Sequence, residues 1–248
     1  MGERVETVVD ACERELRRWI MRGQVRPGER LPAERALAAR LGVNRTTLRS
    51  ALTRLTTARL VRVRQGSGYI VQDFAKSAGI ELVPELAEED EAGLARMADD
   101  LLRVRRTLLA MALDDLANRP LDRGAVAREA ARFEELVERG ADCHALAAAE
   151  HDLLGALLTA VGRTPVIALS FNSVGFAVRS IPRLCEAMYA DRRALSSLAS
   201  ALVRCAEEPS AATVRAAMRA LDERDGAIIE RLSSRRADRP VEPAGVAE

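Results

Sequence analysis

A short run of arginine and hydroxyl side chains, LGVNRTTLRSALTRL from Leu41 to Leu55, holds the residues best suited to binding a polyanion. Its polar members are Arg45, Thr46, Thr47, Arg49 and Thr53. A guanidinium can make two parallel hydrogen bonds to a guanine edge, and a threonine hydroxyl can bond a phosphate oxygen. Apolar residues recur between them at helical spacing, which predicts a helix from Arg45 to Ala58 with the polar side chains on its outer face. Alone, such a face could simply be solvated.

The elements before this helix decide whether its polar face binds a polyanion or is only solvated. Apolar residues at three- and four-residue spacing predict a helix from Glu6 to Arg22. The dipeptide Pro27-Gly28 predicts a turn, and AERALAARLG predicts a second helix with Pro32 in its first turn and Gly42 at its end. A short turn follows, in which we expect Asn44 to cap the third helix.

After the third helix the apolar period changes from helical to alternating. LVRVRQGSGYIV, from Leu60 to Val71, predicts a β-hairpin with a Gly-rich tip. Two helices joined by a short turn and followed by a hairpin are typical of a winged helix-turn-helix, whose recognition helix enters the DNA major groove. On the wing, Arg64, Gln65 and Gly66 are the expected contacts to the DNA backbone.

The charge distribution agrees with a nucleic-acid partner for one part of the chain. The net charge is +1, but residues 1–78 hold 16 Lys/Arg and 8 Asp/Glu, whereas the remainder holds 22 and 29. Such asymmetry indicates a basic module joined to an acidic one.

The segment from Val25 to Phe74, VRPGERLPAERALAARLGVNRTTLRSALTRLTTARLVRVRQGSGYIVQDF, resembles the GntR family of bacterial transcription regulators. The resemblance implies a DNA-binding domain over residues 1–74, with contacts at Arg35, Arg45, Thr46, Thr47, Arg49 and Gly66. Asn44 and Gln65 stand at positions that vary in the family, so the operator sequence stays open. An ion pair with Glu34 or a neighbouring glutamate is the alternative for Arg35.

Residues 82–232 show helical periodicity throughout, with short loops between the periodic segments, one of which runs from Thr164 to Tyr189. We expect a six- or seven-helix antiparallel bundle for dimerisation and effector binding, joined to the first domain by a linker at 75–81. The polar, Pro-containing tail at 233–248 predicts disorder. The fold class is therefore mainly α, with one small β-hairpin.

An all-α second domain after a GntR-type head resembles the FadR subfamily, most of whose bundles hold a metal through one Asp and three His. This chain has only His144 and His151, which we interpret as surface or capping residues, so we predict no metal.

The bundle resembles the metal-free branch that binds long-chain acyl-CoA. The sites for an effector are then Arg105, Leu109, Asn172, Arg179, Asp225 and Ile229. Asp222, Asp225 and Ile229 stand where that branch has aromatic and small residues, and the two acids would repel a phosphate-bearing ligand. We interpret Arg103 and Arg106 as members of surface ion pairs along their helix.

The expected function is a homodimeric regulator that binds a palindromic operator and responds to a small acidic metabolite, with an acyl-CoA as the candidate. An effector-free repressor whose bundle only dimerises is the alternative.

The sequence shows no cluster of nucleophiles and histidines that would suggest an enzyme, and no cofactor is expected. The four cysteines are interpreted as small buried apolar residues. No apolar run is long enough to span a membrane and the first 20 residues lack a signal-peptide pattern, which predicts a cytoplasmic protein.

Overall fold

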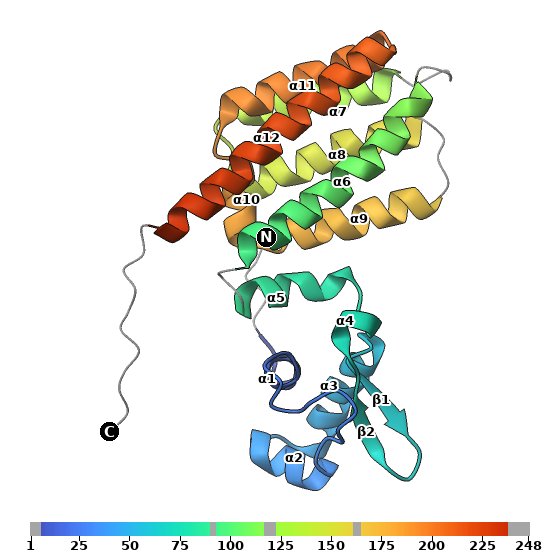
Figure 1. Ribbon diagram of the computed structural model, residues 1–248, viewed down its shortest axis with the longest axis vertical. Coiled ribbons are helices and arrows are strands. Elements are labelled where there is room, and N and C mark those ends of the chain that lie inside the picture. The colour runs from blue at the N-terminus through green and yellow to red at the C-terminus, as the bar shows by residue number, and fades with distance from the viewer. Residues whose placement is uncertain (1–5, 90–92, 117–122, 161–164, 238–248) are drawn as a thin grey trace. The chain divides into compact units, whose positions relative to one another are not determined.

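The computed structural model describes residues 6–89, 93–116, 123–160 and 165–237, and the chain forms two compact units, 1–82 and 83–248 (Figure 1). The described part of the first unit contains four α-helices, one 3-10 helix and a two-stranded antiparallel sheet. Its elements are α1 (Val8–Met21), α2 (Glu34–Leu41), α3 (Arg45–Thr57), β1 (Val61–Arg64), β2 (Gly68–Val71), α4 (Phe74–Ser77) and the 3-10 helix η1 (Ile80–Leu82).

The third helix of this unit, α3, packs against α1, α2 and β1. The predicted inward residues Leu48, Ala51, Leu52 and Leu55 are all fully buried, because their spacing places them on one side of the helix. The outer face keeps the polar residues in solvent, as predicted. The apolar stripe therefore fixes which face of α3 is free to bind.

Local capping explains small differences from the expected helix ends. The Thr7 hydroxyl accepts from the Asp10 amide and the Asp10 carboxylate accepts from the Thr7 amide, so α1 begins at Val8 rather than Glu6. Ala33 is the N-cap of α2, so the prediction that Pro32 lies in the first turn was wrong. Gly42 ends α2 in the left-handed conformation, with φ of +65°.

The hairpin pairs Val61 with Val71 and Arg64 with Gly68, as an antiparallel ladder. Backbone bonds from the segment 28–31 to Tyr69 and Val71 support the other edge of β2. The segment 75–81, expected as a linker, instead holds most of α4 and the start of η1 and falls within the first unit. Ser77 anchors α4 to that unit by donating a hydrogen bond to the Arg59 carbonyl.

The second unit is an all-α bundle, as expected. Its described helices are α5 (Val83–Glu89), α6 (Leu94–Leu116), α7 (Arg123–Glu138), α8 (Cys143–Ala160), α9 (Pro165–Arg179), α10 (Pro182–Met188), α11 (Arg192–Glu207) and α12 (Ala211–Ala237). Six are long, and α5 and α10 have seven residues each. Helix α6 packs against α8, α9 and α12, whereas α11 packs against α7 and α12 (Figure 1).

Two boundaries in the bundle differ from the sequence prediction. The segment from Thr164 to Tyr189 was expected as one helix, but it divides into α9 and α10 because Pro182 has no amide hydrogen to continue the ladder. Helix α12 runs to Ala237, five residues into the expected disordered tail. Residues 238–248, the rest of that tail, lie outside the described residues. None of the described helices combines the length and apolarity needed to cross a membrane.

Candidate nucleic-acid interface and bundle cavity

The start of α3 presents free backbone and side-chain donors to solvent. Asn44 caps the helix, and its Oδ1 accepts from the Thr47 amide at 2.8 Å. Arg45 and Thr46 lie exposed in the first turn, and Thr47 is half-buried. The first turn of a helix also offers unpaired amides and the positive end of the helix dipole, so this end of α3 favours a phosphate.

Asn44→Ala should lower the stability of the first unit by about 1 kcal/mol, because the cap of α3 is lost. Asn44→Ser keeps a capping oxygen and should be close to wild type. Urea unfolding followed by the fluorescence of Trp19, the single tryptophan of the chain, measures both. Equal stability of the alanine and serine variants would contradict the capping role.

The arginines of the recognition face differ in how they are held. Arg49 Nε donates to Glu34 Oε2 at 2.9 Å, and the Arg49 side chain stays 68% exposed. This pair ties α3 to α2 and occupies the glutamate that had been the alternative partner of Arg35. Arg35 and Arg45 are exposed and have no ion pair with any residue that the structure describes.

The third arginine of α3, Arg54, forms ion pairs with two acids of α1. Arg54 Nη1 lies 2.5 Å from Asp10 Oδ1 and 3.1 Å from Glu13 Oε2. The Thr7 hydroxyl and then Arg54 hold the pKa of Asp10 below its usual range. Arg54 therefore braces the two helices, and Arg45 is the one arginine of α3 that has no ion pair with a residue that the structure describes.

The wing gathers three arginines on one face. Arg64 lies opposite Gly68 in the ladder, and Arg62 lies on the same side of β1. The Arg30 guanidinium passes 3.6 Å from the place where a side chain at Gly68 would begin. Gly66 and Gly68 both have positive φ, at +73° and +81°, which glycine adopts without strain. The sequence analysis missed Arg30, which only the pairing of residues 28–31 with β2 brings to the wing.

In the bundle, a buried carboxylate collects most of the polar contacts. Glu150 of α8 is 1% exposed and accepts from Arg105 of α6, from the Tyr189 hydroxyl and from both terminal nitrogens of Arg224 on α12. Burial alone would raise the pKa of Glu150, but Arg105 and Arg224 together hold it well below its usual range. Burial, followed by the charge of Glu150, raises the pKa of Tyr189. The cluster is thus an ionised glutamate between two guanidinium groups.

Two buried donors of this cluster, Arg105 Nη1 and Arg224 Nε, have no hydrogen-bond partner among the described residues, and Arg105 lies beside a small cavity. Arg105 is 6% exposed. The cavity has a volume of about 20 Å³, close to the space of one water molecule. Its polar lining comprises Arg105, Glu150, His151, Arg179 and Tyr189.

His151 lies between this cavity and α9. Its ring stacks on Phe171 with 4.9 Å between centroids, and its Nε2 lies 3.2 Å from Asn172 Oδ1. Burial and then the charge of Arg179 lower the pKa of His151. Gly175 leaves the room that the ring occupies, since a side chain there would begin 2.6 Å from His151 Nδ1. A neutral His151 fits a cavity that already has two arginines.

Arg106 corrects one prediction about the ion pairs. It was expected to pair along its own helix, but Arg106 Nη1 lies 3.0 Å from both Asp222 Oδ1 and Asp225 Oδ2 of α12. Arg103 does pair along α6, with Asp99. The two aspartates thought to repel an anionic ligand therefore share Arg106 as an ion-pair partner, which offsets part of their negative charge.

The surroundings of the Asp225 side chain nevertheless make a negative charge unfavourable. It is 2% exposed and its Oδ1 has no partner among the described residues, so burial raises its pKa to about 6. Between pH 4 and 6 the folded protein retains a proton that the unfolded chain releases. The free energy of unfolding therefore falls across this window as pH rises. Above pH 6 the ionised, buried Asp225 causes its full loss of stability.

Asp225→Asn should remove this pH dependence, because asparagine stays neutral and its oxygen can still accept from Arg106. Relative to the variant, the wild type should lose about 1–3 kcal/mol of stability between pH 4 and 6. Urea unfolding followed by circular dichroism at several pH values measures the difference, and Asp222→Asn, at an exposed acid, is the control. Parallel pH profiles for the wild type and Asp225→Asn would contradict a raised pKa.

The structure brings together only part of the expected effector set. Arg105 and Arg179 line the same cavity. Leu109 is fully buried, Asn172 is exposed and bonds His151, Asp225 pairs with Arg106, and Ile229 is half-buried, and none of these four lines the cavity. Sequence reasoning missed Glu150, Tyr189 and Arg224. A charged residue on the apolar face of a helix was the available signal for Glu150 and Arg224.

The residues around the cavity do not fit the subfamily's Asp and three-His metal set. The chain has two histidines, and His144 is exposed and is not among the residues that line the cavity. The groups beside His151 include Arg105 and Arg179, which would repel a cation. The interior charge of this bundle therefore favours an anion.

Comparisons with known proteins agree with this architecture. The family model for bacterial regulatory proteins of the gntR family matches residues 9–71. A stretch of 67 residues is 51% identical to the HTH-type transcriptional regulator Mce2R of Mycobacterium tuberculosis and covers 27% of this chain and 28% of that protein. A longer stretch of 149 residues is 30% identical to the fatty acid metabolism regulator protein of Edwardsiella ictaluri and covers 60% and 59%. The chain thus spans less than two thirds of the length of these relatives.

A solved structure extends the likeness of fold over both units. It is that of Lar, which controls the expression of the Listeria monocytogenes agr system, with a TM-score of 0.61 at 16% identity over 94% of this chain and 99% of that one. The prediction of a mainly α chain with a winged head and a helical second domain is confirmed. The N-terminal unit, whose helices, turn and wing lie within residues 9–71, thus matches the family model for bacterial regulatory proteins of the gntR family.

Proposed function

We propose that the protein is a cytoplasmic, sequence-specific DNA-binding transcription regulator. The observation that carries the proposal is a set of exposed arginines that pair with no acid among the described residues: Arg35 and Arg45 on the helix-turn-helix, and the three wing arginines. The N-terminal half of α3 lies in the major groove, and the wing contacts the backbone beside it. Thr46 and Thr47 bond phosphates, whereas Arg45 and Arg49 reach base edges.

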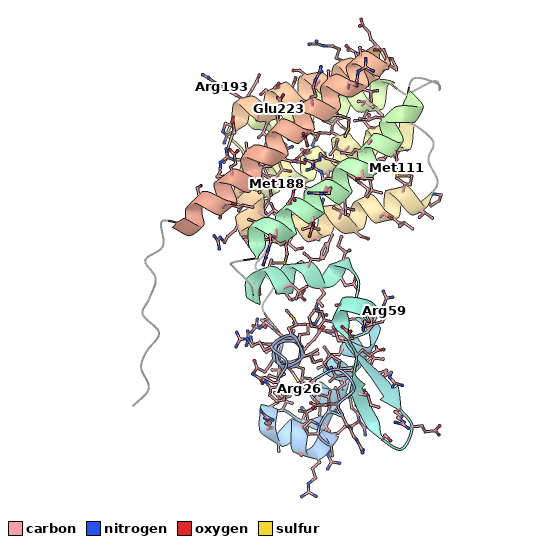
Figure 2. The ribbon with its side chains drawn as sticks, in the orientation of Figure 1. Arg26, Arg59, Met111, Met188, Arg193 and Glu223 are labelled. Atoms are coloured by element: carbon pink, nitrogen blue, oxygen red, sulfur yellow. The ribbon has the colours of Figure 1, made fainter. Side chains whose placement is uncertain are left out.

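We further propose that two chains form a homodimer through the bundle and bind a palindromic operator. Large apolar side chains are exposed along α9 at helical spacing, and α6, which packs against α9, exposes two more (Met111 is labelled in Figure 2). The residues are Val166, Leu169 and Phe176 on α9, and Val104 and Met111 on α6. A surface of this kind is stabilised when a second copy covers it.

Leu169→Glu should weaken the dimer, because it places a charge in this apolar surface. Sedimentation of the wild type should give twice the 27.0 kDa chain mass, and the variant should shift toward a single chain at micromolar concentration. Ala127→Glu, at an exposed residue of α7, is the control and should stay dimeric. A wild-type protein that sediments as a single chain at every concentration would refute the proposed dimer.

The bundle cavity supports a small acidic effector. The unused Nη1 of Arg105 and the nearby Arg179 offer donors to a carboxylate, and Gly175 and His151 shape the remaining wall. About 20 Å³ holds no acyl chain, so an acyl-CoA would bind only if the helices around the cavity separated. The ligand would change operator affinity only as far as it binds one bundle conformation more tightly than the other.

The packed interior favours a second candidate, an effector-free repressor whose bundle only dimerises. Two larger hollows are shallow surface grooves lined mainly by small and charged side chains, of about 500 Å³ between α11 and α12 and about 330 Å³ between α7 and α11. Such grooves offer few apolar side chains against which an acyl chain could pack.

Binding of the full-length protein to DNA from its own upstream region, with and without ligands, tests both candidates. The panel contains long-chain acyl-CoA thioesters and short mono- and dicarboxylic acids. A shift in affinity that Arg105→Met abolishes supports the effector site. Tight binding that no compound changes supports the effector-free repressor, and failure to bind any upstream DNA refutes the regulator itself.

A further inference from the structure

The beginning of α8 and the middle of α10 bring two thiols and an imidazole together on the bundle. Cys143 and His144 are the first two residues of α8, and Cys185 lies in α10. The sulfur atoms of both cysteines and a ring nitrogen of His144 all lie within 4.8 Å of one another. His144 Nδ1 is 4.0 Å from Cys185 Sγ. All four cysteines of the chain are free thiols.

These distances approach those of a tetrahedral metal site. Zn–S bonds of about 2.3 Å and Zn–N bonds of about 2.0–2.1 Å place neighbouring ligand atoms roughly 3.5–3.8 Å apart. Small side-chain rotations at Cys143 and His144, both at the end of a helix, would close the remaining gap. Two thiolates and an imidazole are the donor set of zinc-class ions.

The surroundings of the three residues suit a cation that enters from solvent. Cys185 is buried, Cys143 is half-buried and His144 is exposed, so one side of the cluster is open. Asp142 precedes the cluster, and its Oδ1 accepts from the Ala145 amide at 2.8 Å, which holds a negative charge beside it. No basic side chain pairs with Asp142 among the described residues.

We propose that Cys143, His144 and Cys185 form a binding site for a thiophilic divalent cation of the zinc class. The three side chains supply three ligands, and the fourth position faces solvent. The bound ion links α8 to α10, and α10 leads directly to Tyr189, whose hydroxyl bonds Glu150 two turns along α8 from Cys143. The ion therefore fixes the two helices that frame the Glu150 cluster.

The sequence shows this site poorly because Cys185 is 42 residues from Cys143, with no paired-cysteine motif. It also differs from the Asp and three-His set of the FadR subfamily in ligands and in place. The cavity residues around His151 take no part in it.

Titration of the reduced, untagged full-length protein with Co²⁺, and competition by Zn²⁺, tests the proposal. We expect one equivalent of Co²⁺ to give thiolate-to-cobalt and visible d–d absorption bands that Zn²⁺ removes, and Zn²⁺ to raise the melting temperature. Loss of outer-shell partners alone costs about 10- to 100-fold in metal affinity, so removal of a ligand should cost more than about 100-fold. His144→Asn and Cys143→Ser should each show this loss.

The controls separate the site from other thiols and from misfolding. Cys12→Ser and Cys205→Ser alter buried free thiols outside the cluster and should keep the bands. His144→Asn changes an exposed side chain, so its circular dichroism should match the wild type. Absent bands, bands that persist in both His144→Asn and Cys143→Ser, or a Cys143–Cys185 disulfide that forms in the presence of Zn²⁺ would each overturn the proposal.

Discussion

Glu150→Gln should lower the free energy of unfolding of the bundle by about 3–5 kcal/mol. Glutamine has nearly the shape of glutamate, so the change removes charge and leaves packing intact. Arg105 and Arg224, which are 6% and 4% exposed, would then be buried without their shared counter-ion. Removal of one partner from a buried ion pair is costly because the remaining charge keeps its desolvation penalty.

The measurement is urea unfolding followed by circular dichroism, which reports chiefly the helices of the bundle. Asp99→Asn is the matched control, because it breaks the exposed Arg103–Asp99 pair on α6 and should cost less than about 1 kcal/mol. Trp19 lies in the other unit, so its fluorescence reports whether the effect is confined to the bundle.

Addition of Arg105→Met to Glu150→Gln should restore part of the lost stability, because one of the two uncompensated charges is gone. If the two substitutions acted independently, the losses in the free energy of unfolding that each causes would instead add. A double variant less stable than Glu150→Gln, or a single variant as stable as Asp99→Asn, would contradict the role given to Glu150.

The N-terminal unit was the more predictable part of the chain because its signals are local. The spacing of Leu48, Ala51, Leu52 and Leu55 sets the buried face of α3, and Asn44 sets its first turn. Both depend on residues within one helix, and the structure confirms both. The role of Arg30 depends on the pairing of residues 28–31 with β2, which no local pattern reveals.

The bundle was less predictable because its polar contacts join distant segments. Glu150 is 45 residues from Arg105 and 74 from Arg224. Helical periodicity places each of them on a helix, but the packing of α6, α8 and α12 decides that they meet. The same holds for Arg106, whose partners on α12 lie up to 119 residues away. Burial then sets the pKa of Asp225, which its sequence neighbours do not determine.

Arg45→Ala should weaken operator binding by about 1–3 kcal/mol, or roughly 5- to 150-fold in Kd, if its guanidinium contacts a base edge. Arg45 is exposed at the first residue of α3 and has no competing ion pair among the described residues, so its removal leaves the fold intact. Arg64→Ala on the wing is the matched comparison. It removes a backbone contact, so it should weaken specific and unrelated DNA alike and reduce the slope of log K against log salt by about 1.

Fluorescence anisotropy with labelled operator and scrambled DNA at several salt concentrations separates the two kinds of contact. A base-reading Arg45 lowers the ratio of specific to nonspecific affinity, whereas Arg64 leaves that ratio unchanged. Unchanged operator affinity in Arg45→Ala would refute the base contact. If Arg45→Ala lowered both affinities equally, Arg45 would be a phosphate contact, and recognition would pass to Arg49, whose pair with Glu34 already aligns its guanidinium along the exposed face of α3.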